Sequence, residues 1–237
     1  MPTNEFGQPI GPPLGDWRPP PVPPAEELTG RTVVLQPLES RRHAKPLFEA
    51  YRDAADSLWT YLAFGPCADP AELGAAITAL ADSPARQAFA VVVEGRPVGL
   101  LAYIRIAAAH GVLEIGSLAF SPALQRTTAA TETVSLLIGH AFRLGYRRVE
   151  WKCDDLNAPS RAAALRYGFR YEGTFRNAIT YKGRSRDTAW YSIIDDEWPA
   201  IRAAHRAWLA PDNFDEEGRQ RQPLALGDRS RRSTRSV

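Results

Sequence analysis

The stretch between residues 112 and 144 combines features that suit the binding of an anion. Residues 112–120 form an apolar run that Ser121-Pro122 ends, and residues 128–144 carry apolar side chains at helical spacing. A helix that starts just after a strand presents unpaired backbone N–H groups and the positive end of its dipole at its first turn. The sequence therefore predicts an anion site at the N-terminus of the second element.

The cysteines and histidines of the chain do not have the spacing of a metal site or a redox site. The two cysteines, Cys67 and Cys153, belong to no CxxC pair and lie near no pair of histidines. The four histidines, at positions 43, 110, 140 and 205, are scattered without the spacing of a metal site. We therefore expect no metal, and two reduced cysteines that act as small apolar side chains.

The elements that must position such a site alternate along the body of the chain. Strands are predicted at Thr32–Leu38, Gln87–Val93, Pro97–Ile106, Val112–Phe120, Arg147–Cys153, Arg170–Lys182 and Arg186–Ile194. Helices are predicted at Pro46–Ala55, Pro70–Ala81, Thr128–Leu144, Pro159–Tyr167 and Trp198–Leu209. Hairpins come first and a strand-helix-strand crossover follows. This order predicts an α/β fold with a mixed, mostly antiparallel sheet and helices on both faces.

The two ends of the chain differ from the body. Residues 1–29 are rich in proline, which favours an extended arm, and Trp17 within that arm is expected to lie on the folded body. Residues 210–237 are rich in Arg, Asp, Gln and Ser, and are predicted to form a disordered basic tail. The compact domain is therefore expected to span residues 30–209.

Composition narrows the class of protein. The chain has 237 residues and a formal net charge of +2, with 44% hydrophobic and 24% charged residues, which is typical of a globular protein. No run approaches the roughly 20 apolar residues that a membrane span needs. Residues 1–15 lack the basic start and apolar centre of a secretory signal. We expect a cytoplasmic protein without a membrane partner.

Several motifs in one order resemble the GNAT acetyltransferases of the ribosomal-protein-acetylating (Rim) type. The run Val112–Pro122 resembles their "EIG" strand, and Gln125–Glu132 stands where they carry a pyrophosphate loop that usually reads Q-G-x-G-x-A-T-E. Asn157–Ser160, followed by Gly168-Phe169, resembles their N-x-x-S…GF segment. The resemblance covers roughly Gly30 to Trp198. Several motifs in the same order and at the same spacing identify a family far more specifically than a single motif does.

This resemblance implies acetyl-CoA as the acyl donor and an amine as the acceptor. The acceptor could be a small molecule or a protein N-terminus, and the chain could act as a monomer or a homodimer. The family splays the strand at Leu118, Ala119 and Phe120 away from the next parallel strand, and the pantetheine arm lies in that gap with Asn157 on its far side. The pyrophosphate is expected at the loop and first helical turn formed by Gln125, Arg126, Thr127, Thr128, Ala129, Ala130 and Thr131.

The pyrophosphate loop departs from the family at two positions. Arg126 and Thr128 stand where glycine is usual, and glycine lets a backbone approach a phosphate closely. Arg126 could compensate with a charged contact to the phosphate. The alternative is a relative that binds acyl-CoA without catalysis or has lost its cofactor.

The resemblance also points to two catalytic candidates. Glu114 could take the amine's proton, directly or through water, or it could be a charged residue that faces solvent or pairs with an arginine. Ser160 matches the serine that the family places near the CoA sulfur, where it could protonate the thiolate. Its alternative role is that of a helix N-terminal residue beside Pro159. The tyrosine that the family often uses is replaced by Ala163.

Two further expectations concern partners. The Arg-rich tail could contact nucleic acid, although a solvated tail is favoured because no aromatic residues are interleaved with the arginines. The substrate side of the family fold is expected to carry an aromatic and cationic rim, which would favour an acceptor with an acidic group, unless these are ordinary core aromatics. The rim residues are Trp59, Tyr61, Phe64, Tyr181, Lys182 and Arg184.

Overall fold

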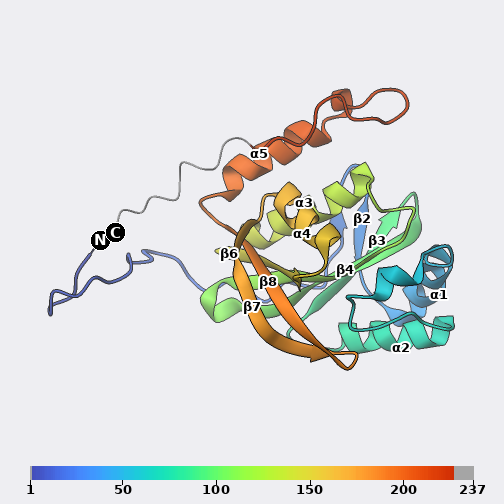
Figure 1. The fold of residues 1–237 in the computed structure, drawn as a ribbon. Coiled ribbons are helices and arrows are strands. Elements are labelled where there is room, and N and C mark those ends of the chain that lie inside the picture. The colour runs from blue at the N-terminus through green and yellow to red at the C-terminus, as the bar shows by residue number, and fades with distance from the viewer. Residues whose placement is uncertain (1, 227–237) are drawn as a thin grey trace.

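A computed structural model describes residues 2–226 of the chain, and its centre is one eight-stranded sheet (Figure 1). The strands lie in the order β1-β2-β3-β4-β5-β6-β8-β7, and the β5–β6 pair is parallel while the other pairs are antiparallel. The strands are β1 (Leu28–Thr29), β2 (Val34–Pro37), β3 (Gln87–Val93), β4 (Arg96–Ala107), β5 (Val112–Phe120), β6 (Arg148–Asp154), β7 (Arg170–Tyr181) and β8 (Arg184–Ile194). The α-helices are α1 (Ser40–Ala50), α2 (Pro70–Ala81), α3 (Thr128–Arg143), α4 (Ala158–Tyr167) and α5 (Trp198–Leu209). Three short 3₁₀ helices are η1 (Asp56–Trp59), η2 (Ala108–His110) and η3 (Pro211–Asn213).

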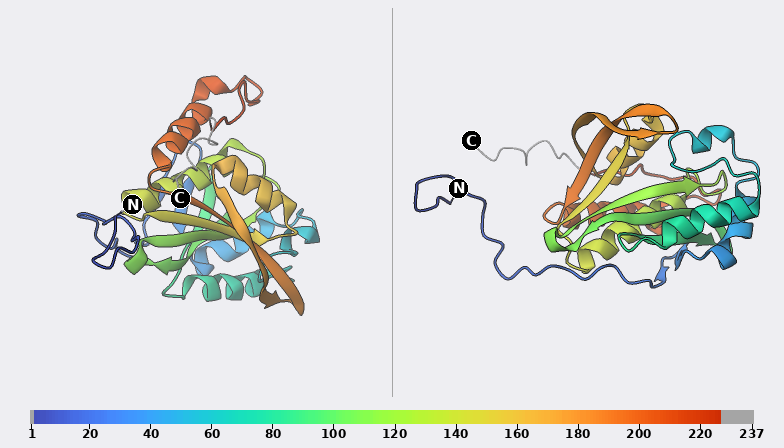
Figure 2. Two further views of the ribbon diagram at one scale, coloured as in Figure 1. Left: turned by 60° about the vertical axis from the view of Figure 1, so that its left-hand side comes forward. Right: turned by 90° about the horizontal axis from the view of Figure 1, so that it is seen from below.

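Helices cover both faces of this sheet, as the sequence predicts. Alternate residues of β3 and β4 supply two separate cores: Phe89 and Leu101 face α3, whereas Ala90 and Leu100 face α1 and α2. Figure 2 shows the pair α1–α2 on one side of the sheet and the pair α3–α4 on the other. The mixed α/β fold class is therefore confirmed.

The first helix differs from its prediction of residues 46–55. It begins at Ser40 and ends at Ala50, so Pro46 lies inside it and not at its first turn. Burial of His43 and Leu47 on one face of α1 decides this register, because these side chains must reach the core. Pro46 is exposed, so water can reach the carbonyl group that loses its helical partner.

A gap opens in the middle of the sheet between β5 and β6. The two strands pair only through three register pairs, from Val112↔Arg148 to Glu114↔Glu150. Beyond Glu114 a bulge distorts β5, where Ser117 has a φ of 55° and the pairing with β4 shifts between Leu100 and Ala102. The strands therefore separate toward the end at which α3 and α4 begin.

The β7–β8 hairpin extends past β6 and arches over one face of the sheet. Its strands lose register between Phe175 and Ile179, where the backbone N–H of Asn177 donates to the Asp187 carboxylate at 2.7 Å. Near the tip, Lys182 Nζ donates to the carbonyl oxygens of Trp59 at 2.7 Å and Gly65 at 3.0 Å. The hairpin tip is thus tied to the loop after η1 (Figure 2).

The terminal segments make specific contacts with the body. In the N-terminal arm, Trp17 Nε1 donates to the Gly145 carbonyl at 3.1 Å, and Tyr146 Oη donates to the Pro21 carbonyl at 3.1 Å. Residues 210–226 differ from a disordered tail, because Trp208 Nε1 donates to the Gln220 amide at 2.7 Å and Leu226 packs on the main core. Residues 227–237, the rest of the predicted tail, lie outside the described residues.

Candidate active site

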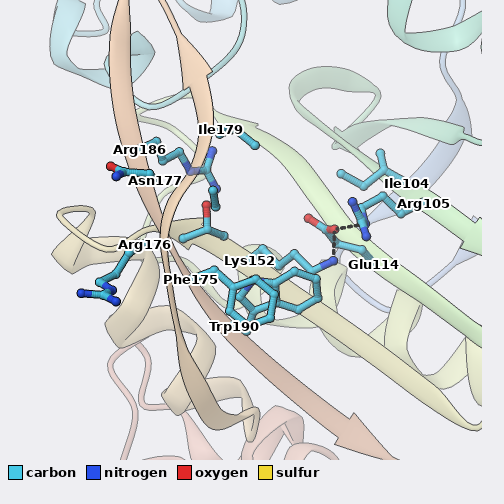
Figure 3. Close-up of a pocket in the computed structure, with 12 residues that line it drawn as sticks. Ile104, Arg105, Glu114, Lys152, Phe175, Arg176, Asn177, Ile179, Arg186 and Trp190 are labelled. Atoms are coloured by element: carbon cyan, nitrogen blue, oxygen red, sulfur yellow. Dashed lines mark ion pairs between the residues drawn. The ribbon is translucent and has the colours of Figure 1, made fainter.

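An open cavity of about 960 Å³ lies beneath the arch of the β7–β8 hairpin (Figure 3). Its floor is formed by β4, β5, β6 and β8 on the sheet face that α1 and α2 cover elsewhere, and its wall by the bulged part of β7. The lining residues are Ile104, Arg105, Glu114, Lys152, Phe175, Arg176, Asn177, Ala178, Ile179, Arg186, Thr188 and Trp190. Of the residues that the sequence marks as catalytic or donor-binding, Glu114 alone is among them.

Glu114 is the last residue of β5 that pairs with β6, and the gap between the two strands opens beyond it. Its side chain is only 6% exposed, and its Oε2 lies 3.1 Å from Lys152 Nζ and 3.6 Å from Arg105 Nε. Burial raises the pKa of the Glu114 carboxyl above its ordinary value, although the two neighbouring cations oppose that shift. A buried carboxylate with a raised pKa facing an open cavity is suited to accept a proton.

Lys152 links Glu114 to a second buried carboxylate. Its Nζ lies 2.7 Å from Glu150 Oε2 and 3.5 Å from the centre of the Trp190 ring, so the ammonium group is held on three sides. Glu150 in turn pairs with Arg148 at 3.0 Å. These contacts fix Lys152 beside Glu114 as part of the cavity floor (Figure 3).

The expected pyrophosphate site keeps the backbone shape that glycine usually allows. Arg126 has a φ of 62°, in the left-handed region that favours glycine, and its side chain is exposed. Thr127 is the N-cap of α3, and its Oγ1 accepts from the N–H of Ala130 at 3.2 Å. Among the described residues, no acceptor is found for the N–H groups of Arg126, Thr128 and Ala129. The turn therefore offers backbone donors and one nearby guanidinium to an anion.

Three residues of this segment face inward instead. Ala129, Ala130 and Thr131 are buried, and Thr131 Oγ1 accepts from Arg166 Nη1 of α4 at 2.9 Å. Their side chains hold α3 in place, so any role in anion binding falls to their backbone.

The edge of β5 that faces the gap is already partly used. The carbonyl oxygen of Phe120 accepts from the Gln125 side-chain amide at 2.8 Å, whereas that of Ala119 lies beside Gly99 of β4 and accepts from Tyr51 Oη at 2.7 Å. Leu118 is partly buried and has no partner strand on the β6 side. A bound arm would share the engaged Phe120 carbonyl group or use the free edge at Leu118.

Asn157 and Ser160 both belong to the start of α4. Asn157 is its N-cap, and its Oδ1 accepts from the N–H of Ser160 at 3.1 Å. Ser160 Oγ accepts from Trp151 Nε1 at 3.0 Å, and its hydroxyl proton can be donated to the neighbouring Cys153 sulfur or to another acceptor. Ser160 thus has the helix N-terminal role that the sequence left open for it, and Asn157 caps the same helix through its oxygen, so its amide nitrogen is not used by the cap.

Glu114 and Ser160 lie on opposite faces of the sheet. Trp151 and Lys152 are neighbours on β6 and point to opposite faces, the first to Ser160 and the second to Glu114. A molecule that meets both residues must therefore reach both faces of the sheet, and the unpaired part of β5 and β6 is where the two strands separate.

The predicted rim is not what lines the cavity. Trp59 is 6% exposed and packs in the second core, and Lys182 binds backbone carbonyls, so both serve the fold. The cations that do line the cavity are Arg105, Lys152, Arg176 and Arg186, and the aromatic residues are Phe175 and Trp190. One feature of the sequence indicates part of this cavity: the charged residues Glu150 and Lys152 alternate with apolar residues on a central strand.

Comparison with known proteins identifies the fold. The model of the acetyltransferase (GNAT) domain matches residues 32–170. This chain belongs to the GNAT acetyltransferase family. A GCN5-related N-acetyltransferase from Brucella melitensis is 44% identical, with a TM-score of 0.86 over 89% of this chain and 97% of that one. A GNAT-family protein from Chromobacterium violaceum ATCC 12472 is 41% identical, with a TM-score of 0.77 over 81% and 97%.

Rim-type members of the GNAT family are similar at lower identity. Mycobacterium smegmatis RimJ, solved in complex with CoA-disulfide, is 21% identical with a TM-score of 0.63 over 74% of this chain and 88% of that one, and this likeness bears on the fold alone. A search of curated proteins found no match.

GNAT acetyltransferases use acetyl-CoA as the acyl donor, and the residues of this chain fit that molecule. The turn at Arg126 offers unpaired N–H groups to a pyrophosphate, and the gap between β5 and β6 leaves a strand edge open to an amide chain. Within residues 2–226, no group of three or more His, Cys, Asp or Glu side chains could hold a metal, and no helix has the length and apolar character to cross a membrane.

Proposed function

We propose that this GNAT acetyltransferase moves the acetyl group of acetyl-CoA to a primary amine, of a small molecule or a protein N-terminus, with Glu114 as the proton acceptor. One observation carries the proposal. Glu114 is a buried carboxylate of raised pKa that stands where the gap between β5 and β6 meets an open cavity. The gap provides a route for the donor and the cavity a place for the acceptor.

The reaction requires a neutral amine. An ammonium group that enters the cavity gives one proton to Glu114, directly or through water, and its nitrogen then attacks the thioester carbon. The N–C bond forms and the C–S bond breaks, and a second amine proton ends on the sulfur. The thioester is reactive, so holding the two reactants in place supplies much of the rate.

Arg105 and Lys152 tune this step. Both cations stabilise the carboxylate form of Glu114, which is the form that can accept a proton. Because burial works in the opposite direction and outweighs the two cations, the pKa of the Glu114 carboxyl is still raised, which makes the carboxylate a stronger proton acceptor than an exposed one.

On the donor side, we propose that Arg126 and the first turn of α3 bind the pyrophosphate, and that the backbone of Leu118–Phe120 and the free amide nitrogen of Asn157 bind the pantetheine arm. Ser160 is proposed as the proton donor to the sulfur. Its oxygen is held by Trp151, which orients the hydroxyl proton away from that ring.

The test is a thiol-release assay with acetyl-CoA and a panel of amines and peptides. A heat-denatured sample controls for spontaneous hydrolysis, and mass spectrometry checks that the acceptor gains one acetyl group. Stimulated thiol release with an acetylated product supports the proposal. Calorimetric binding of CoA with no acetylated product from any amine would favour a non-catalytic acyl-CoA-binding protein.

A further inference from the structure

Strand β8 places three polar side chains in a row along the floor of the cavity. Arg186, Thr188 and Trp190 alternate along the strand, so all three face the same side of the sheet, and all three line the cavity. Their polar atoms Arg186 Nε, Thr188 Oγ1 and Trp190 Nε1 are buried and have no hydrogen-bond partner among the described residues. Figure 3 shows the Arg186 side chain reaching from β8 into the cavity.

Unpaired buried polar atoms are rare, because each loses its bonds to water without gaining others. Arg186 Nε, Thr188 Oγ1 and Trp190 Nε1 are three such atoms on one strand, and two further buried atoms of the same cavity, Glu114 Oε2 and Lys152 Nζ, are met only by ion pairs. Their concentration at one place indicates a ligand that supplies the missing partners.

The charge of the cavity indicates the kind of ligand. Four cations line it, and Glu114 is the one carboxylate among the described lining residues. Arg105 and Lys152 already share Glu114. Arg186, by contrast, has no carboxylate within ion-pair distance among the described residues. A partly buried guanidinium without a counter-ion favours the entry of an anion.

The strand register gives the distance between this cation and the base. Trp190 is the register partner of Lys152, which holds Glu114, and Arg186 lies four residues further along β8. At about 3.3 Å per residue, roughly 13 Å separates the backbone of Arg186 from that of Trp190. Arg186 is thus displaced along the sheet from Lys152 and Glu114, so an acceptor that contacts both Glu114 and Arg186 needs its two charged groups several bonds apart.

We infer that the acceptor is an amine that also carries a carboxylate several bonds away from the nitrogen. This inference rests on the proposed function. The amine lies at Glu114 and the carboxylate pairs with the Arg186 guanidinium, and Thr188 Oγ1 and Trp190 Nε1 can donate to that carboxylate or, in a peptide, to carbonyl groups between the two ends. Both a free ω-amino carboxylate and a peptide N-terminus followed by an acidic side chain have this chemistry.

The experiment compares matched acceptors on the wild type and two variants. The free acceptors are 5-aminopentanoate, its methyl ester and pentylamine; the peptides differ only by Glu or Gln at the second residue. Arg186→Gln removes the cation. Arg184→Gln is the control, because Arg184 lies two residues away on the same strand, is exposed and does not line the cavity.

For the wild type, kcat/KM is expected to favour the carboxylate over its ester or amide by on the order of 10- to 100-fold, the usual worth of a charged hydrogen bond. Arg186→Gln should remove that preference and leave the ester rate within about threefold, and Arg184→Gln should keep it. Arg186→Lys, which keeps the charge and loses the two-pronged geometry, should fall between. A preference in the free amines identifies a small molecule, and a preference in the peptides alone identifies a protein N-terminus.

Equal rates for carboxylate and ester, or a preference that survives in folded Arg186→Gln, would overturn the inference while leaving acetyl transfer intact. Melting curves check that each variant is folded. Calorimetry of 5-aminopentanoate and the Glu peptide against the CoA-loaded protein gives a readout without turnover. If no amine is acetylated, the proposed function fails. The anion site is still supported in that case if the wild type binds one of these ligands and Arg186→Gln weakens the binding. If neither ligand binds the wild type, the anion site is refuted as well.

Discussion

Replacing Glu114 by glutamine removes the proposed base and keeps the shape of the side chain. Among the described residues that line the cavity no second carboxylate could take over, and Glu150 is held by Lys152 and Arg148. General bases contribute about 10²- to 10⁴-fold to such reactions. Since Lys152 and Arg105 make Glu114 a weaker base than burial alone would, we expect a loss near the lower limit, about 100-fold at pH 7.

The dependence on pH gives a sharper test than the loss itself. With an ordinary primary amine of pKa about 10.4, roughly one molecule in 2,500 is neutral at pH 7, and this fraction rises tenfold for each pH unit. The variant depends on that fraction, so its rate should rise about 100-fold between pH 7 and pH 9. The wild type starts from the ammonium form and ionised Glu114, so its rate should be nearly flat once the pH exceeds the raised pKa of Glu114.

The substitution should not unfold the protein. Because the pKa of Glu114 is raised in the folded state, the folded protein holds this proton more tightly than the unfolded chain does. The stability that Glu114 contributes is therefore present at low pH and is lost as the pH rises through the raised pKa. Glutamine is neutral at every pH, so the melting temperature of the variant at pH 7 should equal or exceed that of the wild type.

The assay is the pH–rate profile of kcat/KM from pH 6 to 9 for the wild type, Glu114→Gln and Glu150→Gln. Glu150 makes the matched control because it is buried and pairs with the same Lys152 but does not line the cavity. Its variant should keep the flat profile. If Glu114→Gln also keeps the wild-type profile, the proton leaves the amine by another route and the proposed role of Glu114 is wrong.

Three further predictions concern the donor side. Acetyl-CoA or CoA at 100 times its Kd should stabilise the native protein by about 2.7 kcal/mol, seen as a higher melting temperature, and no shift together with no heat by calorimetry would contradict donor binding. Asn157→Ala should weaken CoA binding by about 1–2 kcal/mol, measured by calorimetry. Asn157→Asp should show the same loss, because it keeps an oxygen acceptor for the Ser160 N–H but lacks the amide donor. Unchanged affinity in both variants would mean that Asn157 serves only as a helix cap. Ser160→Ala should lower kcat at every pH and change the Kd for CoA by no more than about threefold, whereas loss of CoA binding would make Ser160 a donor ligand and not an acid.

Most of the fold could be predicted from the sequence because its strands and helices are periodic and have clear ends. The helix at α2 is an example: Asp69 caps it, Pro70 stands at its first turn, and the predicted bounds are those of the structure. The exception is α1, whose register depends on burial of His43 and Leu47 against distant strands. Local preference placed Pro46 at a helix start, and the tertiary core overrode it.

The candidate site could be predicted only where chemistry follows from neighbours in sequence. Glu114 and the Thr127 cap belong to continuous motifs. The cavity floor is different, because Lys152 and Trp190 meet through the pairing of β6 with β8, and Arg186 enters the cavity through the shift in register between β7 and β8. No spacing along the chain encodes these contacts, so the residues that recognise the acceptor could not be found from the sequence.

The narrow pairing between β5 and β6 has a mechanical consequence. Strands β1–β5 form one half of the sheet and β6–β8 the other, and along their shared line only three register pairs join them. Such a line is a natural hinge between the two halves of the sheet. A long molecule bound across it would contact both halves and restrict their relative motion. We therefore expect hydrogen–deuterium exchange to slow on CoA binding along the facing edges of β5 and β6 more than at the outer strands β1 and β7, which lie far from the hinge.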